Sequence, residues 1–176
     1  MSDLKTPGPV LFFFSVLYNE TAVSLSEVRA LTSSICPIDF SFHHDYYPMK
    51  DYYSKEMGDS LHLKRIFFLC SNAIDRFELV TFKKLSDQLE KSNSVNRKRN
   101  INIDVGFVAL DQVVLATGKP YYHRIHLKDG VFANLELYFQ DNEFKTFPWS
   151  YPDYSHPEIR DFFKWARMLL KNTISV

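Results

Sequence analysis

Two largely apolar runs in the first half of the chain predict the centre of a β-sheet. They lie at 10–18 (VLFFFSVLY) and 63–70 (LKRIFFLC). Apolar runs without polar alternation are typical of strands buried on both faces. We therefore expect both runs to be inner strands of a sheet. Weaker alternation at 38–43 and at 101–107 predicts two further strands.

Apolar residues at helical spacing predict helices after the first and third of these strands. One covers 21–35 and ends before Pro37, and the other follows Asp75. The clearest amphipathic pattern predicts a third helix near the C-terminus. Its apolar face, which we expect to pack on the core, consists of Ile159, Phe162, Phe163, Ala166, Leu169 and Leu170.

The order of these elements predicts the fold class. The polar, tyrosine-rich segment 45–60 lacks periodicity and is predicted as a loop, and 110–116 is predicted as a short helix ending at Gly118. The first six elements then run β-α-β-β-α-β, the split βαβ arrangement of ferredoxin-like folds. We expect one α+β domain over 1–176: a ferredoxin-like βαββαβ core with a mixed or antiparallel sheet, an added β-hairpin and a C-terminal helix. The first eight residues are expected to be flexible.

Alternating apolar residues at 123–127 and 131–139 predict the added hairpin. A two-residue turn at Asp129-Gly130 would place the two apolar sets on opposite faces of the pair. A three-residue loop at 128–130 instead pairs Leu127 with Val131, and it places Gly130 at a left-handed bulge position. We predict the second register.

Charge and cysteine content restrict the partners and the compartment. The formal net charge is 0, and the short basic run at 97–99 is predicted to be a solvated loop, so nucleic acid is not an expected partner. Cys36 and Cys70 lie in apolar contexts, which indicates buried thiols in a reducing compartment such as the cytoplasm. The apolar run at 10–17 is too short to span a bilayer, so no membrane association is expected.

Several short segments carry a resemblance to a known family. They are DYYSKEMG at 51–58, NIDVGF at 102–107, LATGKPYYHRIHL at 115–127 and WSYPDY at 149–154. In this order they resemble the bacterial family called domain of unknown function 4416, over most of the chain. The resemblance implies no established activity or cofactor. Some members are labelled as GTP-binding proteins, but this chain has no GxxxxGK[ST] loop.

The most suggestive polar residues lie beside and within the predicted hairpin. Lys119, His123 and Arg124 could supply charge-assisted donors to an anion, with histidine available for proton transfer. Asn102 and Asp104 share one face of a strand and are expected to support them. Alternatively, His123 is a histidine at the core edge, and the strand face is an ordinary solvent-facing edge.

Other polar groups give weaker signals. Aromatic-acidic segments in predicted loops make a second set of candidate ligand-binding residues, which are Asp51, Tyr53, Glu56, Tyr151 and Asp153. The group His43-His44-Asp45, with Glu56 and His62, suggests a metal, but neighbouring histidines on a strand point to opposite faces, so no metal site is expected. No complete catalytic set is present. Two functions therefore remain open: a site for a small anionic ligand, with phosphorylated compounds included, or a non-catalytic interaction or scaffold module.

Overall fold

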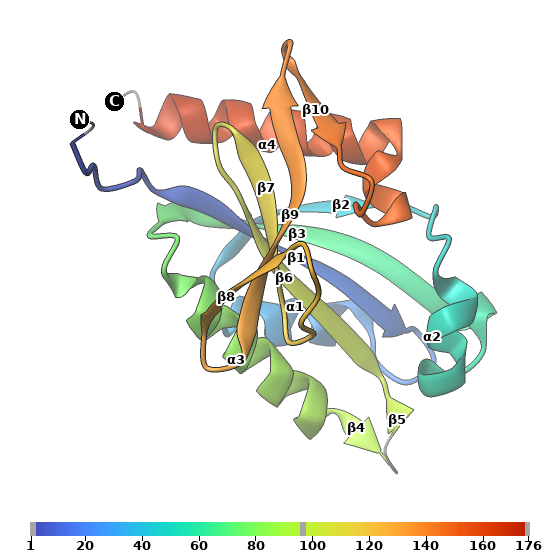
Figure 1. The fold of residues 1–176 in the computed structure, drawn as a ribbon. Helices are drawn as coiled ribbons and strands as arrows, with labels where there is room; N and C mark the ends of the chain where they lie inside the picture. The colour runs from blue at the N-terminus through green and yellow to red at the C-terminus, as the bar shows by residue number, and fades with distance from the viewer. Residues whose placement is uncertain (1–2, 96–97, 175–176) are drawn as a thin grey trace.

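The computed structural model describes residues 3–95 and 98–174 of the chain, and within them one antiparallel sheet holds most of the strands (Figure 1). Its strand order is β10-β9-β7-β6-β1-β3-β2, and β8 pairs with β9. The strands are β1 (Val10–Asn19), β2 (Ile38–His43), β3 (Leu63–Ile74), β6 (Ile101–Val108), β7 (Gln112–Thr117), β8 (Arg124–Lys128), β9 (Val131–Gln140) and β10 (Glu143–Thr146). The short strands β4 (Ser94–Val95) and β5 (Lys98–Arg99) form a separate pair.

Helices cover both faces of the sheet. They are α1 (Leu25–Ser33), α2 (Lys50–Met57), α3 (Glu78–Ser92) and α4 (Pro157–Ile174), with 3-10 turns η1 (Ser60–His62) and η2 (Pro152–Ser155). The elements β1, α1, β2, β3, α3 and β6 give the antiparallel order β6-β1-β3-β2, which is the ferredoxin-like arrangement. The predicted α+β class and its ferredoxin-like core are confirmed. Among the described residues, no helix combines the length and the apolar character needed to cross a membrane.

Alternate residues of β1 divide the core into two layers. Phe12 packs edge-on against Phe82 of α3, with the ring centroids 4.7 Å apart. The next residue, Phe13, points to the other face and meets Phe163 of α4 at 4.9 Å. Both β1 and β3 lie inside the sheet, and the apolar face of α4 packs on the core, as predicted.

The secondary structure predicted for two segments is wrong. Segment 45–60 is not a loop throughout, because it contains α2, which is largely polar and buries few side chains, so the sequence shows little helical periodicity. Segment 110–116 is not a helix, since β7 occupies most of it and lies buried between β6 and β9. A short apolar run fits a buried strand as well as a helix, and the two adjacent valines favour the strand.

The hairpin prediction is right in part. Gly130 has φ +77°, the left-handed conformation expected, and Ile125 pairs with Ala133. The predicted three-residue loop and the pairing of Leu127 with Val131 are wrong, because Lys128 pairs with Val131 and the loop has two residues. An irregularity between His126 and Lys128 restores the alternation. The extra residue is thus accommodated within β8. The apolar side chains of β8 are also not in the core: Ile125 is 71% exposed.

Two of the sequence expectations fall partly outside the described residues. Of the segment 1–8, expected to be flexible, residues 1–2 lie outside. Of the basic run 97–99, Arg97 lies outside, while Lys98 and Arg99 form β5 rather than a loop.

Candidate functional sites on the two faces of the sheet

A polar cluster occupies the α4 face of the sheet, beside the part that α4 covers. Strands β1, β3, β6 and β9 contribute the floor, and the segments around α2 and η2 cover it. We define the polar cluster as Ser15, Arg65, Asn102, Asp104, Asn134, Glu136, Tyr53, Tyr151 and Asp153. Five of the residues predicted from the sequence therefore meet here.

A buried ion pair joins the floor of the polar cluster to its cover. The Arg65 guanidinium lies 2.5 Å from the Asp153 carboxylate, and both side chains are at most 5% exposed. A second nitrogen of Arg65 donates to Ser15 Oγ at 2.6 Å. The guanidinium also lies over the ring of Tyr47, 4.4 Å from its centroid. The positive charge is thus compensated within the protein.

Glu136 is a carboxyl group with no exposed surface in the same cluster. It accepts hydrogen bonds from the Asn134 side chain and from the backbone N–H of Tyr151. Burial outweighs these bonds and raises the pKa of Glu136 to about 8. At neutral pH the group is therefore mostly protonated.

This pKa predicts a pH-dependent stability. The folded-state value of about 8 lies above the ordinary value of 4.5, so the folded protein binds the proton more tightly than the unfolded chain does. The stabilisation is complete below pH 4.5 and is lost as the pH rises through 8. Between pH 5 and 8, we expect the free energy of unfolding of wild type to fall relative to that of Glu136→Gln by roughly 3 kcal/mol.

Urea unfolding at several pH values measures this difference. The control is Glu143→Gln on β10, an exposed position, which should follow wild type over the whole range. Equal pH slopes for Glu136→Gln and wild type would show that Glu136 ionises normally.

Asn102 and its neighbours form the other end of the cluster. Asn102 donates to Asp104 at 3.2 Å and accepts from Arg99 at 3.0 Å. Arg99 in turn pairs with Glu56 of α2 at 2.5 Å and with Glu90 of α3 at 3.3 Å. Glu56 is thus linked to the polar cluster through Arg99. Asp51, by contrast, is exposed in the first turn of α2.

The predicted anion-binding residues lie on opposite sides of β8. Arg124 donates to the backbone carbonyl of Lys119 at 2.9 Å, and it reaches the Tyr151 hydroxyl at 3.4 Å. Lys119 and Arg124 are therefore neighbours at the rim of the polar cluster. His123 instead faces the other side of the sheet, where its ring stacks on Trp149 with centroids 4.9 Å apart. The structure does not bring all five residues into one pocket.

The polar cluster has little internal space. The cavity between Tyr53, Asp104, Tyr151 and Asp153 measures about 20 Å³, which is room for about one water molecule. In this conformation the cluster cannot hold a metabolite.

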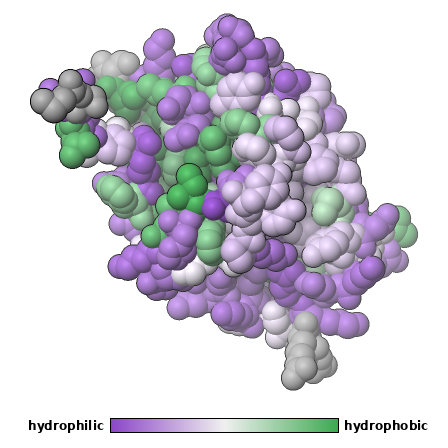
Figure 2. Space-filling model, in the orientation of Figure 1, coloured by the Kyte–Doolittle hydropathy of each residue, from purple (hydrophilic) through white to green (hydrophobic). Residues whose placement is uncertain are grey.

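A much larger groove lies on the face that carries α3. We call it the α3 groove: it runs between α3 and the β8–β9 hairpin and encloses about 870 Å³. Its apolar walls include Leu79, Val80, Leu85, Phe107, Ile125, Leu127, Ala133 and Leu135. Figure 2 shows hydrophobic surface gathered over β8, with hydrophilic surface around it. The exposed apolar residues of β8 therefore line a groove.

Two side chains at the α3 groove carry polar atoms without partners in the described part of the chain. Neither ring nitrogen of His123 has a hydrogen-bond partner within the described part of the chain, and the same is true of Arg76 Nε. Buried polar atoms are normally paired. Both side chains line the groove, and these unpaired atoms are buried beneath its surface.

The charges that line the α3 groove are mainly positive. Among the described residues, Arg76, Lys84 and Lys128 line the groove together with one carboxylate, Asp129. That carboxylate pairs with Lys84 at 2.8 Å and ties the hairpin turn to α3. The Asp129–Lys84 pair leaves two positive charges at the groove, on Arg76 and Lys128.

Sequence reasoning found His123 but missed the rest of the groove. The missed signal is the combination of a helix whose exposed side carries Phe77 and Leu85 with a hairpin whose apolar residues stay exposed. Apolar periodicity does not show whether two apolar faces touch or leave a gap between them, so the groove could not be predicted from these patterns.

Together these features define an α+β protein with a ferredoxin-like half, a closed polar cluster on one face of its sheet and an open apolar groove on the other. A family model described as a domain of unknown function, DUF4416, matches residues 8–169. The chain belongs to that family. No match was found among curated proteins or among solved structures.

Proposed function

We propose that the protein binds a small amphipathic anion in the α3 groove: a molecule with an apolar body and one carboxylate or phosphate group. The observation that carries the proposal is the groove itself, about 870 Å³ lined mainly by apolar side chains. Ligand pockets commonly have this size and this lining, with a few polar groups that fix orientation.

The positive charges at the groove favour a negatively charged ligand. Arg76 precedes the first turn of α3, and its guanidinium has no carboxylate partner among the described residues. Lys128 lies beside the hairpin turn and is likewise without an ion pair there. An anionic head group would neutralise these positive charges. A guanidinium group binds carboxylates and phosphates through paired hydrogen bonds.

The polar cluster is a poorer candidate for the ligand site than the α3 groove. Its arginine, Arg65, is paired with Asp153, and its cavity is small. The groove is open, and Arg76 and Lys128 at the groove have no ion pair within the described part of the chain.

Calorimetric titration with a graded set of compounds tests the proposal. Decyl phosphate and decanoate combine an apolar chain with an anion, whereas decanol lacks the charge and inorganic phosphate lacks the chain. We expect the two amphipathic anions to bind and to raise the melting temperature by mass action. Decanol should bind more weakly, and inorganic phosphate should not bind measurably.

Two pairs of variants locate the binding. Ile125→Asp places a charge in the groove at a 71% exposed position, and Leu61→Asp is its control at a 77% exposed position outside the groove. Only Ile125→Asp should abolish binding. Arg76→Gln should weaken binding tenfold or more, because a hydrogen bond to a charged group contributes about 1.5–3 kcal/mol. Lys64→Gln on β3 should not weaken it.

The interaction-module alternative predicts a different result. In that case none of the amphiphiles binds, and sedimentation shows a self-associated protein that Ile125→Asp, but not Leu61→Asp, converts to the monomer. This outcome would replace the ligand proposal with a protein interface at the α3 groove.

A further inference from the structure

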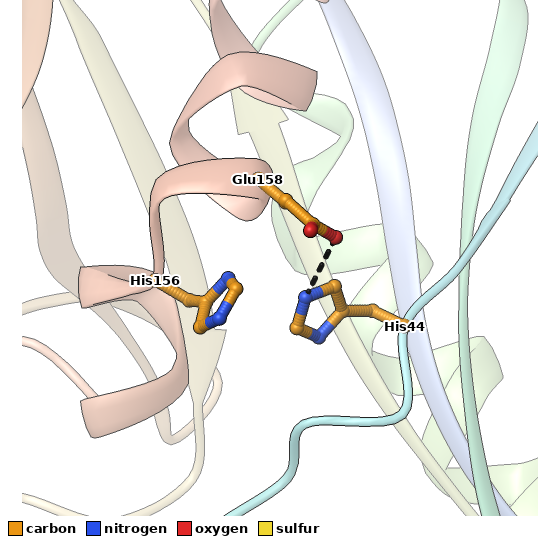
Figure 3. A group of neighbouring side chains, drawn as sticks. All are labelled: His44, His156 and Glu158. Atoms are coloured by element: carbon orange, nitrogen blue, oxygen red, sulfur yellow. Dashed lines mark ion pairs between the residues drawn. The ribbon is translucent and has the colours of Figure 1, made fainter.

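A separate group of side chains lies on the α4 face of the sheet, at the start of α4. His44 follows β2, His156 follows η2, and Glu158 lies in the first turn of α4. Figure 3 shows the side chains of His156 and Glu158, from the junction of η2 and α4, beside that of His44 from the segment after β2. One donor atom from each lies within 4.8 Å of the others.

The hydrogen bonding of His44 leaves one nitrogen facing a carboxylate. Nδ1 lies 3.3 Å from the backbone carbonyl of Tyr46, which only accepts, so Nδ1 carries a proton. In neutral imidazole Nε2 is then an acceptor, yet it lies 3.2 Å from a carboxylate oxygen of Glu158. Two acceptors at this distance require a positive centre between them, which is either a proton or a metal ion.

His156 adds a ring nitrogen that makes no hydrogen bond within the described residues. Its ring lies 4.4 Å from the ring of His44, and its buried Nδ1 has no hydrogen-bond partner among residues 3–95 and 98–174. An imidazolium–carboxylate pair between His44 and Glu158 would leave this nitrogen unexplained. A metal ion shared by all three residues would explain it.

We infer that His44, His156 and Glu158 form a binding site for a divalent transition-metal ion of the zinc class. Donors bound tetrahedrally at about 2.0–2.1 Å lie roughly 3.4 Å apart, and the His44–Glu158 separation of 3.2 Å already fits that spacing. Small side-chain rotations bring in the third donor. Two imidazoles favour zinc, nickel or cobalt over magnesium or calcium, which prefer oxygen ligands.

The surroundings suit such a site. The backbone carbonyl of Tyr46 orients His44, as an outer partner commonly does for a metal-bound histidine. Three protein ligands leave a coordination position for water, the arrangement of open zinc sites. Glu158 is 68% exposed and borders an open aromatic hollow of about 620 Å³ lined by Phe42, Phe162 and Trp165. The α3 groove is on the other face of the sheet, so the metal site and the proposed anion binding can be tested independently.

Zinc and cobalt titrations of the full, untagged chain after treatment with a chelator test this site. Zn²⁺ affinity is measured by competition with a chromophoric chelator, and Co²⁺ is followed by its visible absorption. We expect wild type to bind one equivalent of each ion. His156→Gln and Glu158→Gln should each weaken binding at least tenfold, with loss of the visible cobalt bands.

Matched controls separate ligands from neighbours. His43→Gln removes the exposed histidine next to His44, and Asp161→Asn removes a carboxylate one turn further along α4. Both should bind zinc as wild type does. Metal-free melting temperatures should be similar for all variants, and zinc should raise them only in wild type and the two controls. Failure of wild type to bind zinc, or binding by His156→Gln and Glu158→Gln equal to that of wild type, would overturn the assignment in favour of an imidazolium–carboxylate pair.

Discussion

Replacing Asp153 by asparagine is expected to lower the free energy of unfolding by about 3–5 kcal/mol. The substitution removes the carboxylate that lies 2.5 Å from the Arg65 guanidinium, at a point where the arginine side chain is only 5% exposed. The guanidinium keeps its hydrogen bond to Ser15 and its contact with the Tyr47 ring, but neither neutralises the charge. A buried charge without a counter-ion accounts for the large cost.

Urea unfolding of four proteins checks this result. Glu20→Gln breaks the pair between Glu20 and Lys64, which are 3.7 Å apart and more than 40% exposed, and it should cost less than about 1 kcal/mol. The double variant Arg65→Met with Asp153→Asn removes both charges and should recover part of the loss. If Asp153→Asn were as mild as Glu20→Gln, the Arg65–Asp153 pair would be solvated in solution.

Truncating Phe163 to alanine is expected to cost a similar 3–5 kcal/mol. Its ring has no exposed surface and lies 4.9 Å from the ring of Phe13 and 5.5 Å from that of Tyr154. The cavity left behind is bordered by β1 and η2, which cannot close in without shifting the sheet or the cover of the polar cluster. The loss therefore includes both the transfer of the ring and the cavity.

The same helix offers a control for this prediction. Met168 is 53% exposed, so Met168→Ala should change the free energy of unfolding by less than about 0.5 kcal/mol. A cost below about 1 kcal/mol for Phe163→Ala would mean that α4 does not pack on the sheet as the structure shows.

The parts of the fold that were predictable are those in which burial leaves a repeating pattern. The run at 10–18 and the apolar face around Phe162 and Phe163 report burial directly, and they placed β1 inside the sheet and α4 upon it. The order of the first six elements then defined the ferredoxin-like half.

Elements with weak or ambiguous patterns were not predictable. The helix α2 buries only a few side chains such as Met57, so its helical period is hidden among polar residues. The strand β7 contains Val113 and Val114 within a run too short to show any period. The irregularity at Leu127 follows from pairing across the hairpin, which no local pattern specifies.

The sites show the same division. Asn102 and Asp104 were correctly placed on one strand face by the period of two, and the sheet brings Asp104 near Tyr151 and Asp153. Contacts between distant segments were not foreseen. His44 was considered beside His43 and Asp45, its neighbours in sequence, whereas its spatial partners His156 and Glu158 lie more than a hundred positions away.

The position of the bound anion tests the proposed function most directly, and NMR chemical-shift mapping with decyl phosphate measures it. We expect backbone amide shifts along α3 and β8, including Arg76, Leu85 and Ile125, with little change in the polar cluster at Asp104 and Asp153. Shifts confined to the polar cluster, or no saturable shifts at millimolar ligand, would contradict binding in the α3 groove.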